Sequence, residues 1–155
     1  MNTYCDANAF VKIYLTMPER ADAEAFLNSE PAARTSPLPV TDILRLEVSN
    51  AIERMVFESR ASGQWRVTPE MAMVAHSDFE TDLKVGEWMR LVPLTLADIE
   101  TEFDTLVRRY TAVHGFRTYD VIHVASALKL RCKRFLSFDA KANALAKLVG
   151  LKTAL

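Results

Sequence analysis

Short runs of consecutive apolar residues alternate along the chain with longer segments in which apolar positions recur every three or four residues. A short apolar run is typical of a buried strand, whereas the longer spacing marks one face of a helix. The segment 8–15, for example, has apolar residues at 10, 11, 14 and 15. The alternation of the two patterns predicts strands that are connected by helices.

Capping residues and glycines set the expected ends of the helices. Thr41 and Thr68 precede two long periodic segments, and Gly63 and Gly86 follow them. A threonine before a helix can accept hydrogen bonds from free N–H groups, and glycine easily adopts the left-handed conformation that ends a helix. We expect strands at 2–6, 34–38, 88–94, 134–138 and 151–153, and helices at 8–15, 18–28, 42–61, 69–85, 96–114, 119–130 (capped by Thr118) and 140–149.

This order of elements predicts the fold class. Short apolar strands that alternate with helices argue for an α/β domain with a mainly parallel sheet covered on both faces. The chain has 155 residues, the usual size of one domain. No repeat or long linker divides it, so we expect residues 1–155 to form a single domain.

Composition narrows the classes of function. A net charge of -1 excludes a globally basic nucleic-acid binder, but it allows a local basic rim. No segment has the roughly 20 apolar residues of a membrane span, and the N-terminus lacks a signal-peptide pattern. We therefore expect a cytoplasmic protein with no membrane partner. Cys5 and Cys132 are too few for a disulfide framework, and we expect reduced thiols.

Four acidic residues stand where the pattern calls for apolar side chains. Asp6 and Asp139 end two apolar strands, Asp120 opens an apolar helix, and Glu47 interrupts the apolar face of another helix. Carboxylates are rarely buried unless they are paired or bind a metal. Ligands of parallel α/β sheets bind beyond the carboxyl ends of the strands, so we expect Asp6, Asp120 and Asp139 to share one rim, with Glu47 reaching in.

Each acid also has a structural interpretation. Asp120 could be a charge that is favoured at a helix start, and Asp139 could be an N-cap. Asp6 could be a turn residue that bonds its own backbone, and Glu47 could pair with an arginine inside the core. Taken singly, each residue leaves these alternatives open.

Together, the four acids raise an electrostatic problem. Two carboxylates about 4 Å apart repel each other by about 4 kcal/mol at an effective dielectric constant near 20. A divalent ion held by oxygen atoms relieves this repulsion, and Mg²⁺ or Mn²⁺ fits better than zinc because no His or Cys cluster is present. The pattern therefore favours metal-dependent phosphodiester chemistry.

The acids lie in segments that resemble the PIN domain, and within it the VapC-like toxins of bacterial toxin–antitoxin pairs. The segments are Tyr4 to Lys12, Leu46 to Ala51, Arg117 to Leu128, Phe135 to Asp139 and Leu148 to Leu151. The resemblance implies a three-layer α/β/α sandwich with a mainly parallel central sheet. It implies an acidic pocket for Mg²⁺ or Mn²⁺, formed by Asp6, Glu47, Asp120 and Asp139.

The same resemblance implies a function and partners. The expected activity is that of an endoribonuclease toxin on structured RNA, such as tRNA or ribosomal RNA, with inhibition by a cognate antitoxin and frequent homodimerisation. Two positions depart from the family pattern. Asn8 stands where many members have serine or threonine, and Asn143 stands where some have a further aspartate, so a second metal would be held weakly or only with substrate.

Supporting residues follow from their positions. As a hypothesis, Asp6, Asp120 and Asp139 ligate the metal, while Glu47 ligates it directly, reaches it through water or orients the nucleophile. Asn8, Ser137, Asn143 and Thr118 are candidates for support of the ligands or contact with substrate. His123, one turn after Asp120, could be a general base, although a polar residue packed beside the pocket is the simpler interpretation.

Other functions remain open at this point. A phosphatase-like or receiver α/β domain also places aspartates around Mg²⁺, but the segment 6–8 lacks the second aspartate of a phosphatase motif. A catalytically inactive PIN fold could serve as a scaffold that binds protein or RNA. The presence of all four acids argues against that alternative.

Overall fold

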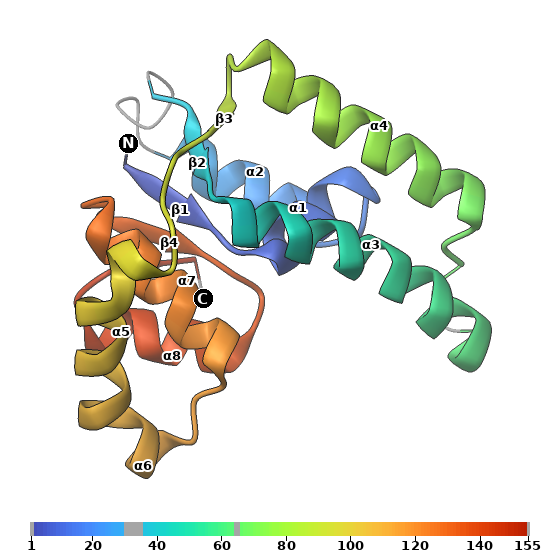
Figure 1. Ribbon diagram of the computed structural model, residues 1–155. Coiled ribbons are helices and arrows are strands. Elements are labelled where there is room, and N and C mark those ends of the chain that lie inside the picture. The colour runs from blue at the N-terminus through green and yellow to red at the C-terminus, as the bar shows by residue number, and fades with distance from the viewer. Residues whose placement is uncertain (1, 30–35, 64–65, 155) are drawn as a thin grey trace.

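The described strands are all paired in parallel. The computed structural model describes residues 2–29, 36–63 and 66–154. Within these residues, β1 (Thr3–Cys5), β4 (Arg134–Leu136) and β5 (Lys152–Thr153) form a sheet in the order β1-β4-β5. A second parallel pair, β2 (Leu38–Val40) and β3 (Met89–Leu91), lies beside β1 (Figure 1). The mainly parallel sheet predicted from the sequence is confirmed.

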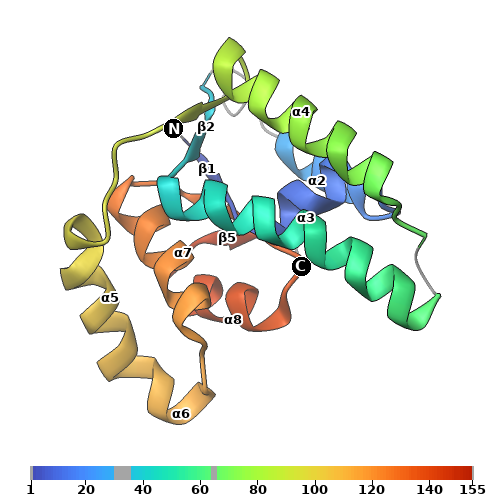
Figure 2. The same cartoon turned by 45° about the vertical axis from the view of Figure 1, so that its right-hand side comes forward.

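Helices cover the strands in two groups (Figures 1 and 2). The first group packs around α1 and comprises α1 (Ala7–Tyr14), α2 (Arg20–Asn28), α3 (Asp42–Ser62) and α4 (Pro69–Val85). The second group packs around α7 and comprises η2 (Ala97–Ile99), α5 (Glu100–Leu106), a π-helical turn η3 (Val107–Thr111), α6 (Ala112–His114), α7 (Thr118–Lys129) and α8 (Ala140–Leu148). The strands lie between the groups, which gives the expected α/β/α arrangement.

The predicted capping residues stand at both ends of the two longest helices. The Thr41 hydroxyl accepts a hydrogen bond from the Leu44 N–H at the start of α3, and Thr68 caps α4 in the same way. Gly63 and Gly86 follow these helices with φ angles of 62° and 72°, where a side chain would be strained. Local chemistry therefore determines both helices, as the sequence predicted.

The strands β1 and β4 are shorter than expected at their carboxyl ends, because the residues expected to end them cap the helices that follow. Asp6 is the N-cap of α1 rather than the last residue of β1, and Asp139 is the N-cap of α8. At α7 the N-cap is Arg117, so the predicted cap at Thr118 is one residue off.

The predicted strand at 34–38 is largely displaced. Its residues 34 and 35 lie outside the described part of the chain, and β2 is observed at Leu38–Val40. Pro39 lies within β2 and has no N–H to donate. Among the described strands, the ladder of β2 is formed with β3 alone, which tolerates this proline.

A buried aromatic pair stands at the centre of the core. The rings of Tyr4 on β1 and Phe135 on β4 are stacked with their centroids 6.0 Å apart, and neither is exposed. Cys5 and Cys132 are buried free thiols, as expected. Among the described residues, no helix combines the length and apolar character needed to cross a membrane.

Candidate active site

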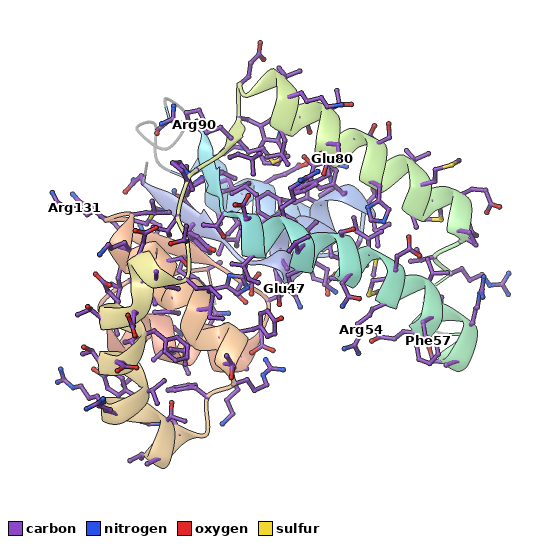
Figure 3. The ribbon with its side chains drawn as sticks, in the orientation of Figure 1. Glu47, Arg54, Phe57, Glu80, Arg90 and Arg131 are labelled. Carbon is purple, nitrogen blue, oxygen red and sulfur yellow. The ribbon has the colours of Figure 1, made fainter. Side chains whose placement is uncertain are left out.

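The four acids come from four separate segments and line one groove. Asp6 follows β1, Asp139 follows β4, Asp120 lies in the first turn of α7, and Glu47 lies in the second turn of α3. The groove has a volume of about 760 Å³. Glu47 lies on the side of α3 that is turned toward α7, and Arg54 lies farther along the same helix (Figure 3). The expected gathering of the acids is observed.

Asp6 is buried at the floor of the groove. Its Oδ1 accepts a hydrogen bond from the Ala9 N–H at 3.0 Å, and its Oδ2 accepts one from the Ser137 hydroxyl at 2.5 Å. Burial raises the pKa of the Asp6 carboxyl to about 6, and the nearby charge of Glu47 adds to this effect, although His123 and the two hydrogen bonds oppose it. The ionised form of Asp6 is therefore disfavoured at this position unless a cation lies nearby.

Asp120 is held by Arg117. The Arg117 guanidinium donates from Nη2 to Oδ1 at 3.0 Å and from Nε to Oδ2 at 3.1 Å, and the Arg117 backbone N–H donates to Oδ2 at 3.0 Å. Hydrogen bonds to Asp120 and then to Asp139 raise the pKa of Arg117 above its usual value, so it stays charged. Asp120 therefore has the predicted role at the helix start, and it also carries an ion pair.

Asp139 combines a cap with a second ion pair. Its Oδ1 accepts hydrogen bonds from the N–H groups of Lys141 and Ala142, and its Oδ2 accepts one from Arg117 at 2.8 Å. Partial burial works to raise the pKa of Asp139, but the hydrogen bonds from Ala142, Arg117 and Lys141 outweigh it and hold the pKa below its usual value. One oxygen of this carboxylate thus caps α8, and the other accepts a hydrogen bond from Arg117 in the groove.

Glu47 contacts His123 instead of an arginine. His123 Nε2 is hydrogen-bonded to Glu47 Oε2, and His123 Nδ1 lies 3.1 Å from the hydroxyl of Tyr4. His123 is only 3% exposed, whereas the side chain of Glu47 is 27% exposed. Because both ring nitrogens are engaged, the imidazole has no free nitrogen for a general base, which favours the interpretation of a residue packed beside the pocket.

The other predicted residues divide into two sets. Ser137 bonds Asp6 and also accepts the Asp139 N–H at 2.9 Å, while the buried Asn143 amide donates to the carbonyls of Ser137 and Asp139, so both support the acids. Asn8 lines the groove itself. Thr118 is exposed and, among the described residues, does not belong to the groove wall.

Two residues of the site were not singled out by the sequence. Arg117 and Tyr4 stood only at the starts of two segments that resemble the PIN domain. The position of Arg117, three residues before Asp120 at a helix start, is a signal for a local ion pair. The contact between Tyr4 and His123 joins residues 119 positions apart, and it has no sequence signal.

The donors fit a hard divalent cation. Among the described residues, no three His, Cys, Asp or Glu side chains are arranged as a preformed metal site. The four acids nevertheless offer only oxygen atoms, the donors that Mg²⁺ and Mn²⁺ prefer. A cationic guanidinium already bridges Asp120 and Asp139, which marks this place as favourable for positive charge. The residues therefore fit such an ion once Arg117 moves aside.

Comparison with known proteins agrees with this geometry. Residues 3–148 match the family model of the PIN domain. Among solved structures, the chain is similar to the toxin VapC20 of Mycobacterium tuberculosis, which is described as cleaving the sarcin–ricin loop. The two share 14% sequence identity with a TM-score of 0.60, over 92% of this chain and 94% of that one. No curated protein sequence gives a significant match.

Proposed function

Because the chain belongs to the PIN-domain family, we propose that it is an endoribonuclease that depends on Mg²⁺ or Mn²⁺ and cleaves structured RNA such as tRNA or ribosomal RNA. The observation that carries this proposal is the gathering of Asp6, Glu47, Asp120 and Asp139 in one groove. The fold shared with VapC20, a toxin described as cleaving the sarcin–ricin loop, supports an RNA substrate.

The proposed roles follow from the positions of the side chains. Asp6, Asp120 and Asp139 would hold the ion. The Ser137 hydroxyl donates to the Asp6 carboxylate, and the Asn143 amide donates to the backbone carbonyl of Asp139, so it helps to fix that residue. When bound, the ion supplies Lewis-acid activation of water and neutralises charge at the scissile phosphate. Arg117, whose side chain is 65% exposed, can bind a phosphate oxygen when it releases the carboxylates, and Glu47 is placed to orient the nucleophile.

Cleavage by purified protein tests the proposal. Asp6→Asn and Asp120→Asn are expected to abolish Mg²⁺-dependent cleavage of total RNA while the protein stays folded. Asp104→Asn is a matched control, because Asp104 is exposed and pairs with Arg108 away from the groove. Full cleavage by both groove variants, or cleavage that persists in a chelator, would refute the assignment.

The same experiment separates the alternatives. A folded protein with no cleavage under Mg²⁺ or Mn²⁺ would favour the inactive scaffold, and turnover of a phosphomonoester would favour the phosphatase-like function. Sequencing the ends of the RNA fragments then identifies the target and distinguishes tRNA from ribosomal RNA.

The biological setting is part of the proposal. We propose that the protein is the toxin of a toxin–antitoxin pair, acts in the cytoplasm as a homodimer, and is silenced by a cognate antitoxin. Co-expression with the product of an adjacent small reading frame should relieve growth inhibition, and light scattering of the purified protein gives its mass in solution. We also propose that residues 1–155 form one domain, for which a single cooperative unfolding transition is expected.

A further inference from the structure

Glu47 differs from the other three acids in how it is held. Asp6 and Asp139 accept hydrogen bonds from backbone N–H groups at helix starts, and Asp120 accepts one from the Arg117 N–H. Glu47 lies inside α3, where the backbone N–H groups are already used by the helix. Its side chain has several rotatable bonds and reaches the groove partly exposed. The fold must therefore fix this carboxylate by another contact.

That contact is His123, which is itself held rigidly. The imidazole is buried on α7, and its Nδ1 faces the Tyr4 hydroxyl on β1. The Tyr4 ring is fully buried and stacked on Phe135 of β4. Burial raises the pKa of Tyr4 above its ordinary value, although the hydroxyls of Thr41 and Ser126 oppose this effect, so Tyr4 keeps its proton. The chain of contacts runs from the centre of the sheet to the groove.

The direction of the hydrogen bonds follows from the chemistry of the partners. An ionised Glu47 can only accept, so the proton between the two residues belongs to His123 Nε2. The Tyr4 hydroxyl donates to Nδ1 when the ring is neutral and accepts from it when the ring is charged. In both states the Nε2–H points at Glu47. His123 therefore cannot use Nε2 to take a proton from water without first releasing Glu47.

We propose that His123, anchored by Tyr4, is a positioning residue that holds the Glu47 carboxylate in its productive orientation. This inference rests on the proposed function, because it assigns a role within the same groove. We therefore expect the cleavage rate to depend on whether the side chain at position 123 can donate a hydrogen bond to Glu47, and not on whether it can transfer a proton.

Two substitutions of similar size separate these possibilities. His123→Leu removes the donor, whereas His123→Gln places an amide N–H close to the position of Nε2. We expect His123→Leu to reduce the single-turnover rate of RNA cleavage by about 10- to 100-fold, the usual effect of losing a residue that orients a metal-site carboxylate. His123→Gln should retain the rate within about threefold, a fraction of that loss. Equal losses in the two variants, or an unchanged rate in His123→Leu, would overturn the proposal.

A double-mutant cycle tests whether the effect passes through Glu47. In the Glu47→Gln background, His123→Leu should cause little further loss of the single-turnover rate, since the contact is already changed. Independent, multiplied losses would contradict a positioning role. His76→Leu is a matched control, because His76 also contacts a glutamate, Glu53, but on the exposed side of α3 and α4.

Nitrogen NMR of the histidine rings detects the contact between His123 and Glu47 in the absence of RNA and metal. His123 should show a protonated Nε2 whose chemical shift changes in Glu47→Gln, and a Nδ1 signal that changes in Tyr4→Phe. An unprotonated Nε2 that is insensitive to Glu47→Gln would overturn the inference. If the protein proves to have no ribonuclease activity, this measurement still decides the His123–Glu47 contact, so the two failures are distinguishable.

Discussion

The guanidinium of Arg117 binds both carboxylate oxygens of Asp120, three residues later in the chain, and the same Nη2 also reaches Asp139 at 2.8 Å. A cationic side chain thus bridges two of the proposed metal ligands. The side chain of Arg117 is 65% exposed, so it can leave without disturbing the core. A divalent ion and Arg117 would then compete for the same oxygens.

Removing the guanidinium should therefore favour metal binding. We expect Arg117→Gln to tighten the affinity for Mn²⁺ by about two- to fivefold, a factor worth roughly 0.4–1 kcal/mol, as for an ion pair whose cation is largely exposed. The metal-free variant should also be less stable, because the buried Asp120 loses its partner. Isothermal titration calorimetry measures the affinity, and thermal unfolding with and without Mn²⁺ measures the stability.

Arg54→Gln controls for the loss of positive charge near the groove. Arg54 lines the same groove but pairs with Glu58 and not with the four acids. It should change the Mn²⁺ affinity less than Arg117→Gln does. Weaker Mn²⁺ binding by Arg117→Gln would show that the arginine assists the metal instead of competing with it.

The two roles of Asp139 can be separated by the choice of substitution. Serine is as good an N-cap as aspartate, but it is not a carboxylate ligand. Asp139→Ser should therefore keep the free energy of unfolding near that of the native protein, whereas Asp139→Ala should lower it by about 1 kcal/mol. Both variants should lose RNA cleavage. Urea denaturation together with a cleavage assay checks this, and an active Asp139→Ser variant would contradict the ligand role.

Asp6 should make the metal-free protein less stable as the pH rises. Its folded-state pKa of about 6 lies above the ordinary 3.8, so its favourable contribution is fully present below pH 3.8 and is lost as the pH rises through 6. This difference corresponds to about 3 kcal/mol at neutral pH, as an upper limit. Asp6→Asn keeps the N-cap and should stabilise the metal-free protein by about 2–3 kcal/mol at pH 7.5, and by less at pH 4.5.

Urea denaturation in the presence of a chelator measures this difference at the two pH values. Mn²⁺ should reverse the ranking at pH 7.5, because only the native groove has the Asp6 carboxylate to bind it. A variant that is less stable than the native protein at pH 7.5 without metal would refute the expected cost of the buried charge.

Ser137 should also affect the pKa of the Asp6 carboxyl group. Its hydroxyl donates to Asp6 Oδ2 and thereby lowers the Asp6 pKa against the effect of burial. Ser137→Ala should raise that pKa further, so Mn²⁺ binding should weaken more at pH 6 than at pH 8. Calorimetric titrations at both pH values test this, with Ser49→Ala on the exposed side of α3 as the control. Equal weakening at both pH values would indicate a structural effect only.

The fold could be predicted where local chemistry decides it. The limits of α3 and α4 follow from Thr41, Gly63, Thr68 and Gly86, whose capping roles depend only on neighbouring residues. The strand at 34–38 was placed too early, because the extent of a strand depends on its pairing partner, and the residues that pair with β2 are 51 positions later in the chain. The structural interpretations of Asp120 and Asp139 proved compatible with a site, since each carboxylate has two oxygens for two tasks.

The sequence by itself determined the alternation of strands and helices and the identity of the four acids, because apolar periodicity and misplaced charges are local properties. Only the tertiary structure decided their partners. Arg117, besides its local contact with Asp120, also reaches Asp139, and the residue that holds Glu47 is His123, itself anchored by Tyr4. These contacts join segments up to 119 residues apart, and they exist only because packing of the sheet and helices brings the side chains together.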